Sequence, residues 1–336
     1  MRFLLRIGLG LLVLVPGLYG LAYAGSFHPA EVQSEEVVCP AETPELAPGQ
    51  KVKVLNWNVQ YMASKNYVFF YDMPDGSGPD KGPSQEHVEQ TLADVARVIQ
   101  DENPDVLVIQ EFHDNHDRTY NQDQLAELLK LLPPEYSCYS EALYWQSAFV
   151  PHPMVWGRVG MKLGTISKYR ISEATRYQLP LKDNDPLSRQ FAFRRAILEV
   201  KLPVSGGAAF AVLNTHMDAF AQGEDTMQRQ VAKVDEVLTA LDEKGHPWII
   251  GGDFNLLPAG FPIEEVNEVA RPYYNTVSEI GPLFAKYNST VPVEQLILPG
   301  REQYYTHWPN NPAFERPDRT IDYIFYGGEI ELNAYR

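Results

Sequence analysis

The stretch DVLVIQE, residues 105–111, is a short apolar run that ends in a carboxylate. Its leucine and β-branched side chains predict a buried strand, and this leaves Glu111 at the carboxyl end of that strand. Directly upstream, apolar side chains recur at helical spacing from Ser84 onward, and the helix is expected to end before Asn103-Pro104. A helix that leads into a buried strand is typical of an α/β fold.

The same alternation of short apolar runs and amphipathic stretches continues in both directions and covers residues 51–336. It predicts one α/β or layered α+β domain, with no internal repeat and no second linker. The segment 255–319 is irregular and rich in Pro, Asn and Tyr, which is typical of loops over one end of a sheet. Strands are expected over residues 52–59, 105–110, 160–167, 195–202, 208–215, 248–251 and 320–326, and further helices over 122–132 and 225–241.

Polar residues of a particular kind stand at the ends of several predicted strands. Taken singly, each of them is more often a solvated charge or a structural side chain than a site residue. As an ordered set they place hydrogen-bond donors and hard oxygen ligands at one rim of a sheet, where a compact polar site can form. They are Asn58, Glu111, Asn214, His216, Asp253, Asn255 and Asp322.

Around these residues the sequence resembles the endonuclease/exonuclease/phosphatase superfamily of divalent-metal phosphodiesterases. A four-letter match such as GDFN would be weak alone, but six matches in the family's order are specific. The resemblance implies a four-layer α/β sandwich, in which helices flank two central, mostly antiparallel sheets. The matching segments are LNWNVQ at 55–60, PDVLVIQE at 104–111, VGMKLGTISKYRI at 159–171, LNTHMD at 213–218, GGDFN at 251–255 and RTIDYIFY at 319–326.

The resemblance also implies the roles of individual residues. Glu111 would be the main metal ligand, and Asn58 would lie beside it and contact metal-bound water or phosphate. His216 would donate a hydrogen bond to a non-bridging phosphoryl oxygen, while Asp253 would orient the attacking water. Carboxylate and amide oxygens form a hard site, so we expect Mg²⁺ or Mn²⁺ as the cofactor rather than a thiolate-bound metal.

Three further residues take family roles. Asn255 would contact the phosphate, Asn214 would hold the loop that carries the histidine, and Asp322 would orient a catalytic histidine further along the chain. Gln60 stands where some family nucleases have an acidic second ligand, and this favours one-metal chemistry or a different metal preference.

The C-terminus departs from the family pattern. In the family, the residue that matches Asp322 orients a histidine in a Ser-Asp-His segment on the final strand. Only 14 residues follow Asp322 in this chain, and none of them is His. Either the chain is a truncated form that lacks its last strand, or it has lost the residue that carries the proton. The chain as written is expected to retain only residual activity, and loss of the last strand would also expose a sheet edge. His307, His113 and His116 are expected to be loop histidines rather than replacements.

Composition and charge limit the class of partner. The 336 residues include 44% hydrophobic and 21% charged side chains, as in a soluble globular protein, and the net charge is −16. A negative field of this size repels polyanions, so we expect no stable nucleic-acid partner. A phosphate-ester substrate is still possible because one local cleft can bind one phosphate. We expect a monomer.

The N-terminus carries an export signal. Arg2 and Arg6 precede 21 uncharged residues, 7–27, and the charge pattern places the rest of the chain outside the cytoplasm. Two outcomes stay open at this point, a cleaved signal peptide or an uncleaved membrane anchor. A Pro-rich tether is expected over 28–50. In an oxidising compartment Cys39 and Cys138 can form one disulfide, and the alternative is two unpaired thiols.

These features together predict an exported Mg²⁺-dependent phosphodiesterase that acts on a phospholipid headgroup or a small phosphodiester. An extracellular nuclease is the first alternative, and a catalytically impaired binding domain is the second. Aromatic side chains flank the motifs at 61–71 and 144–156. They would stack on a substrate, dip into a membrane surface, or simply pack beneath long loops.

Overall fold

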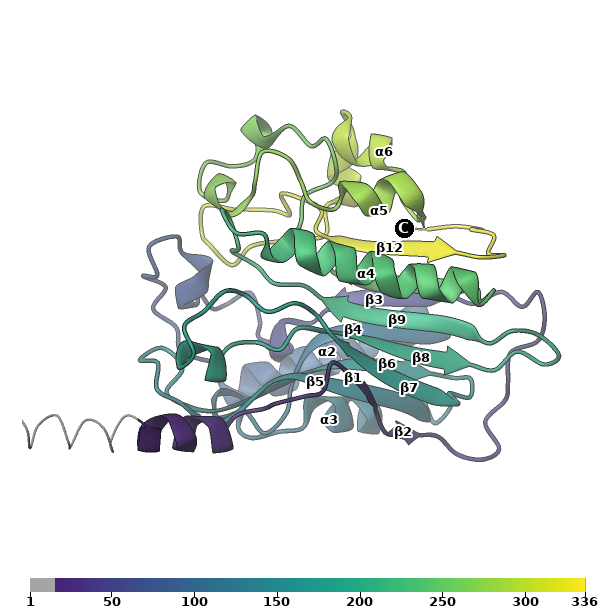
Figure 1. Ribbon diagram of the computed structural model, residues 1–336, viewed down its shortest axis with the longest axis horizontal. Helices are drawn as coiled ribbons and strands as arrows, with labels where there is room; N and C mark the ends of the chain where they lie inside the picture. The colour runs from purple at the N-terminus through teal and green to yellow at the C-terminus, as the bar shows by residue number, and fades with distance from the viewer. Residues whose placement is uncertain (1–15, 336) are drawn as a thin grey trace, which may run out of the picture.

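Two β-sheets pack face to face between layers of helices in the computed structural model, which describes residues 16–335 (Figure 1). This arrangement confirms the predicted four-layer α/β sandwich. Both sheets are mixed, because β3 pairs with β4 and β9 pairs with β10 in parallel, whereas the other neighbours are antiparallel. The five-stranded sheet runs in the order β2 (Val37–Val38), β5 (Cys138–Val150), β6 (Gly157–Ser167), β4 (Val106–His113) and β3 (Val54–Asn58).

The second sheet has seven strands among the described residues. Its centre is formed by β8, β9, β10 and β12, and short strands close both edges. Its order is β1 (Val32–Ser34), β7 (Glu173–Gln178), β8 (Ala196–Leu202), β9 (Phe210–His216), β10 (Trp248–Asp253), β12 (Asp322–Gly327) and β11 (Asn288–Ser289).

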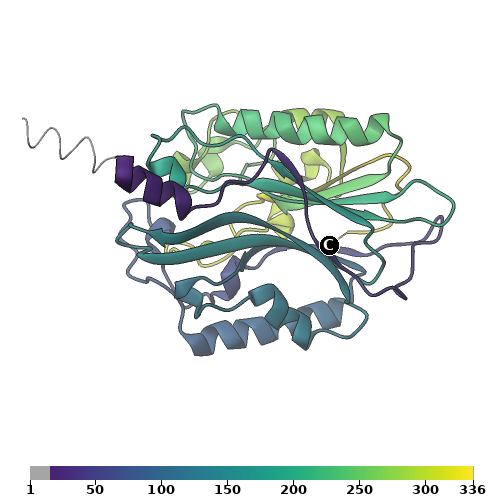
Figure 2. The same ribbon diagram turned by 60° about the horizontal axis from the view of Figure 1, so that its bottom comes forward.

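Helices cover the outer faces of the two sheets (Figure 2). The helices α2 (Gln85–Glu102) and α3 (Gln124–Leu131) pack on the five-stranded sheet, and α4 (Thr226–Glu243) packs on the seven-stranded sheet. Ser84, where the predicted helix begins, caps α2, because its Oγ accepts a hydrogen bond from the backbone N–H of His87. The remaining helices are α5 (Gly281–Lys286), α6 (Val293–Ile297) and the short 3₁₀ turns Gln60–Met62, Phe70–Asp72, Asp117–Thr119, Ser188–Gln190, Ile263–Glu265, Arg271–Tyr273 and Arg301–Tyr304.

Strand β4 contributes to two separate cores. Leu107 and Ile109 face α2 and α3, whereas Val106 and Val108 face the other sheet, and all four are fully buried. This alternation follows from the two-residue period of a strand. It explains why DVLVIQE reads as a continuous apolar run, since both faces of the strand are covered.

The segment expected to be a tether contributes strands to both sheets. Within residues 28–50, β1 extends the seven-stranded sheet beside β7, and β2 extends the five-stranded sheet beside β5. Cys39 and Cys138 form a disulfide with 4.2 Å between their Cα atoms, directly after β2. The two-thiol alternative therefore does not apply, and the segment is held against the domain along its length.

The edge of β12 has partners within the described part of the chain. Asn288 and Ser289 of β11 pair with the far end of β12, and Thr290 donates a backbone hydrogen bond of 3.0 Å to Ile324. At the near end, Thr306 Oγ1 accepts a hydrogen bond from the Asp322 backbone N–H at 3.2 Å. The expected open edge is therefore covered by loops of the 255–319 segment.

The apolar N-terminal run is only partly described. Residues 16–24 are helical, and Figure 1 shows this helix at one end of the molecule, beside the ends of the strands. The first part of the predicted signal or anchor, 7–15, lies outside the described residues. No helix within 16–335 has both the length and the apolar character needed to cross a membrane.

Candidate active site

Three neighbouring strands place predicted site residues side by side. In the parallel pair β9 and β10, His216 lies opposite Asp253, and in the antiparallel pair β10 and β12, Asp253 lies opposite Asp322. The end of one sheet therefore carries an imidazole and two carboxyl groups on adjacent strands. This arrangement follows from strand register alone, because residues in register on adjacent strands are only about 5 Å apart.

The other sheet supplies an amide and a third carboxyl group. Asn58 ends β3 and Glu111 lies in β4, and the Asn58 Nδ2 atom donates to Glu111 Oε1 at 2.9 Å and to Asp253 Oδ2 at 3.0 Å. The Asn58 Oδ1 atom accepts a hydrogen bond from the Gln60 backbone N–H at 2.9 Å. The amide of Asn58 thus joins carboxylates from both sheets as a hydrogen-bond donor.

His216 lies between the same two carboxyl groups. Its Nδ1 atom is 3.8 Å from Glu111 Oε1, and its Nε2 atom is 3.7 Å from Asp253 Oδ2. The ring is buried and also approaches the hydroxyl of Tyr144, 3.4 Å from Nδ1. A small movement would convert these ring-to-carboxylate distances into hydrogen bonds.

Asn255 and Asn214 occupy different depths. The Asn255 Nδ2 atom donates to the Met217 carbonyl at 3.1 Å, and its backbone N–H donates to Asp253 Oδ1, so it lines the site directly. Asn214 is fully buried below the site, where its Nδ2 donates to the carbonyls of Ile109 and Gly164. Asn214 therefore ties the two sheets together under the site, in keeping with a supporting position.

Strained backbone is concentrated around the site. Glu111 has a φ of 65° where the register of β4 shifts, and Asn255 has a φ of 54°. The three residues Gln60–Met62, which begin two positions after Asn58, also have positive φ values. Such conformations cost about 1–3 kcal/mol for a non-glycine residue and persist where the surrounding structure enforces them. The strain at Glu111 turns its side chain out of the strand pattern and toward Asn58.

Burial raises the pKa values of all three carboxyl groups. Burial raises the pKa of Glu111 to about 7, while the hydrogen bond from Asn58 acts in the opposite direction. Burial also raises the pKa of Asp253, and burial together with the charge of Asp253 raises the pKa of Asp322 well above its usual range. A positive charge placed among these groups would relieve the repulsion between them.

Arg195 and Tyr144 were missed in the sequence. The Arg195 guanidinium is buried, stacks on Phe193 and Tyr144 with its carbon 4.3 and 5.0 Å from the ring centres, and lies 3.6 Å from Asp218. Burial, and secondly the charge of Arg195, lower the pKa of His216 well below its usual range. The imidazole is therefore neutral. Arg195 directly precedes β8, at the start of the strand expected over 195–202, whereas Tyr144 lies within β5, and packing between the two sheets brings both to the site.

The donor set fits a divalent cation of the magnesium type. Mg²⁺ is usually held by one or two carboxylates together with waters and substrate phosphate, rather than by a complete protein cage. Glu111 offers such a carboxylate, and Asp253 offers a second one nearby. Among residues 16–335 there is no cluster of three or more His, Cys, Asp or Glu side chains arranged as a ready-made cage. Asn58, predicted beside the ligand, turns its NH₂ group toward the carboxylates.

The other histidines and Gln60 lie outside this cluster. His113 and His116 stack on each other at 3.9 Å, and His113 bonds to Thr119 behind the site. His307 pairs with Arg319 through its backbone, one residue after the Thr306 that contacts the Asp322 backbone. The Gln60 side chain accepts a hydrogen bond from Asn310 at 3.3 Å.

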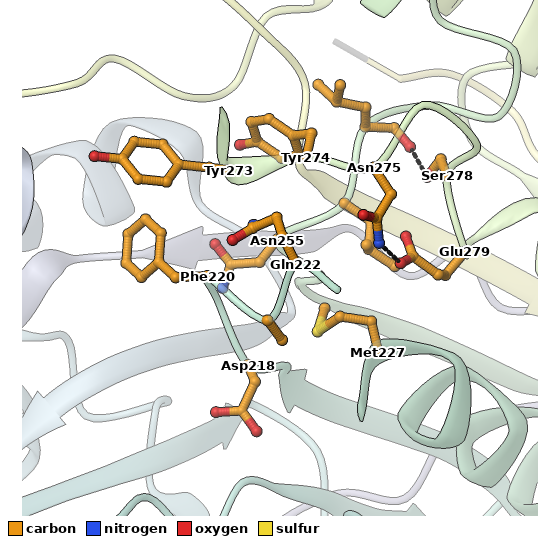
Figure 3. A pocket seen from close by; sticks show the side chains of 13 residues that line it. Asp218, Phe220, Gln222, Met227, Asn255, Tyr273, Tyr274, Asn275, Ser278 and Glu279 are labelled. Carbon is orange, nitrogen blue, oxygen red and sulfur yellow. Dashed lines mark hydrogen bonds between the residues drawn. The ribbon is translucent and has the colours of Figure 1, made fainter. Parts of the chain in front are cut away.

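A narrow polar pocket adjoins the site and shares Asn255 with it (Figure 3). Phe220 and Tyr273 stand on one side of Asn255, with their rings 4.7 Å apart, and Glu279 lies on the other side. The pocket mixes aromatic, amide and carboxyl groups, as sites for small polar molecules often do. Its labelled lining residues are Asp218, Phe220, Gln222, Met227, Asn255, Tyr273, Tyr274, Asn275, Ser278 and Glu279.

Carboxylates, amides and a neutral histidine thus meet at one rim of the two sheets, and this site rather than the fold is the guide to function. The sequence model of the Endonuclease/Exonuclease/phosphatase family matches residues 55–335. The chain therefore belongs to this family of hydrolases, as the six segments had indicated.

The chain is similar to several solved structures. An endonuclease/exonuclease/phosphatase from Beutenbergia cavernae is 21% identical, with a TM-score of 0.52 over 82% of this chain and 64% of that one, so this chain spans less than two thirds of its length. The human Nocturnin catalytic domain is 17% identical, with a TM-score of 0.46 over 87% of this chain and 85% of that one. A Bacteroides thetaiotaomicron mannosyl-6-phosphatase is 16% identical, with a TM-score of 0.48 over 83% of this chain and 86% of that one. Among curated proteins the search found no match.

Proposed function

We propose that the protein is an exported Mg²⁺-dependent hydrolase that cleaves a small phosphodiester or a phospholipid headgroup. The observation that carries the proposal is the hydrogen bonding of Asn58 to both Glu111 and Asp253, with His216 between them. Four groups from two sheets thereby face one small volume. Together they match the needs of phosphoryl transfer, in which positioning and charge stabilisation provide most of the catalysis.

Each side chain has a distinct part in the proposed reaction. Burial raises the pKa of Asp253, and its carboxyl group orients the attacking water by accepting a hydrogen bond from it. Neutral His216 donates one N–H to a non-bridging phosphoryl oxygen, and Asn255 holds the phosphate from the side of the adjoining pocket. Asp322 lies opposite Asp253 in the register, and the 14 residues after it contain no histidine for it to orient. The buried Arg195 contributes positive charge behind the phosphate.

Glu111 would hold the metal in this proposal. A bound Mg²⁺ supplies neutralisation of phosphoryl oxygens and of charge on the leaving group. Asn58 keeps the Glu111 carboxylate in place through its NH₂ group, and the positive φ of Glu111 directs that carboxylate away from the strand. One carboxylate with an amide neighbour leaves space for water and phosphate ligands.

The choice of substrate rests on charge and on the pocket beside Asn255. A net charge of −16 disfavours a long polyanion and permits one phosphate in a local site. In our proposal the pocket between Phe220, Tyr273 and Glu279 holds the alcohol group on one side of that phosphate. The uncharged residues 7–27, with the arginines before them, support an extracytoplasmic location.

The test is hydrolysis of a chromogenic phosphodiester by the full chain in Mg²⁺. We expect EDTA to abolish turnover, and Glu111→Gln to lower kcat by at least about 100-fold because the carboxylate charge is lost. Glu127→Gln, on the exposed surface of α3, is the matched control and should leave kcat unchanged. Turnover that survives EDTA, or full activity of Glu111→Gln, would contradict the proposal.

A further inference from the structure

Exposed apolar side chains gather at the tip of the β5–β6 hairpin and on the N-terminal helix. Phe149 and Trp156, at the hairpin tip, are 45% and 64% exposed and stack edge to face with ring centres 5.1 Å apart. On the helix over residues 16–24, Leu18, Leu21 and Tyr23 are at least half exposed. We call these five side chains the apolar face.

Backbone hydrogen bonds make the apolar face one continuous surface. The Ala148 N–H donates to the Gly25 carbonyl at 2.7 Å, and the Phe27 N–H donates to the Gln146 carbonyl at 3.1 Å. The chain leaving the helix is thus paired with β5 just before the hairpin tip. Both views show the helix beside this end of the β5 and β6 strands (Figures 1 and 2).

The same segments carry no acidic residue, although the chain has 44 of them. Neither the first 30 residues nor residues 142–172 contain Asp or Glu, and beside the hairpin tip the charge of Arg158 stands next to one carboxylate from another segment, Asp117, which accepts a hydrogen bond from the Arg158 backbone N–H at 2.8 Å. Uncharged aromatic rings next to basic side chains are the composition of a membrane interface, where Trp and Tyr place their apolar bodies among lipid headgroups. On a chain with a net charge of −16, a surface that faces only water would be expected to carry acidic side chains as well.

We propose that the apolar face docks on a phospholipid bilayer, with Phe149 and Trp156 inserted beside the N-terminal helix. The uncharged sequence continues from this helix through residues 7–15, so the chain would enter the lipid at the place where the hairpin tip meets it. The hairpin is a second, independent contact that fixes how the domain sits on the surface. A single exposed tryptophan would need no explanation, but an edge-to-face pair continuous with an apolar helix does.

Docking of the apolar face would also bring the bilayer near the candidate active site, and only this part of the inference rests on the proposed function. His113, two residues after Glu111, pairs with Met161 of β6, and Gly157 at the tip lies four residues further along that strand. At about 3.3 Å per residue the tip extends about 13 Å beyond the end of β4. A bilayer at the tip would therefore lie near the end of the molecule that carries the site.

The test uses tryptophan fluorescence of the full chain with vesicles of phosphatidylcholine and phosphatidylglycerol whose acyl chains are brominated. Because bromine quenches only rings that reach the acyl region, we expect quenching of the wild type and loss of most of it in Trp156→Phe. Trp308→Phe is the matched control, since Trp308 is 47% exposed but lies in the loop bound by Lys65, and it should keep the wild-type quenching.

Three results would overturn the proposal. Equal quenching in Trp156→Phe and the wild type would show that the hairpin stays out of the lipid. No quenching in a chain that still sediments with the vesicles would show that the N-terminal segment binds alone. A dimer in lipid-free solution, in which Trp156 is shielded from quenching by acrylamide, would show that a second copy of the chain covers the apolar face. The quenching experiment contains no substrate, so its result is independent of whether the protein hydrolyses a phosphodiester.

Discussion

Glu111 connects the sequence pattern, the strained backbone and the chemistry of the site. It follows an apolar strand, so the sequence places it at a sheet rim, but its φ of 65° and its bond to Asn58 arise only in the folded chain. A buried carboxyl group whose pKa is about 7 is unfavourable for the fold at neutral pH unless a cation compensates. This balance can be measured without any substrate.

We predict that the metal-free protein loses stability as the pH rises from 4.5 to 7. The pKa of Glu111 is about 7 in the folded chain and 4.5 as the ordinary value, so the unfolded chain ionises first and the free energy of unfolding falls across this range. The difference corresponds to about 3 kcal/mol. Chemical unfolding in EDTA at several pH values measures it, and Glu111→Gln should reduce the slope by the part that belongs to Glu111, leaving the part that belongs to Asp253 and Asp322.

Magnesium provides the counterpart to this measurement. At pH 8 added Mg²⁺ should raise the free energy of unfolding of the wild type, because a ligand that binds only the folded state stabilises it, and should have little effect on Glu111→Gln. If both proteins show the same pH slope and the same response to Mg²⁺, Glu111 is neither the destabilised carboxyl nor the metal ligand.

Some residues of the site could be predicted from sequence and others could not, for a physical reason. Asn58, His216 and Asp253 stand at strand ends, and local sequence reveals strand ends. Tyr144 lies in the middle of β5 and Arg195 directly precedes β8, and their approach to the site depends on packing between the sheets, which the pattern of carboxylates and amides at strand ends does not reveal. The orientation of the Asn58 amide depends likewise on the loop at Gln60.

At the scale of elements, predictability follows how each strand is buried. The strand β4, covered on both faces, has a dense β-branched and leucine sequence and was predicted directly. The strand β5, with 13 residues, was missed because its inward side chains alternate with polar and aromatic residues that resemble a decorated loop. The short strands β1 and β2 owe their pairing to the neighbours that they extend, so their own sequence carries little signal.

The double role of β4 leads to a prediction about its helix-facing side. Leu107 is fully buried against α2 and α3, so Leu107→Ala should lower the free energy of unfolding by about 2–5 kcal/mol through lost contacts and a cavity. Leu131→Ala, at a position 43% exposed on α3, should change it by less than about 0.5 kcal/mol. Urea denaturation of both variants measures the difference. If Leu107→Ala lowers the free energy of unfolding as little as Leu131→Ala does, the α2 layer contributes little to stability.

At the scale of the whole molecule, catalysis and stability are assigned to opposite ends of the sandwich. The proposed site lies where Asn58 and Asp253 meet across the two sheets, near the pairing of His113 with Met161. The disulfide lies at the other end of the same sheet, where Cys138 pairs with Ser167, six residues from Met161 along β6. That separation is about 20 Å along the strand.

This arrangement predicts that the disulfide can be removed at the expense of stability alone. It links residues 99 apart in sequence, and a loop of that size restricts the unfolded chain enough to contribute about 4 kcal/mol. In urea denaturation the double variant Cys39→Ser/Cys138→Ser should show a free energy of unfolding lower by this amount, while its kcat at a temperature where it is fully folded should equal that of the wild type. Circular dichroism in the assay buffer establishes the folded fraction. A fall in kcat without unfolding would show that the segment 28–50 positions the site and does more than hold the two sheets together.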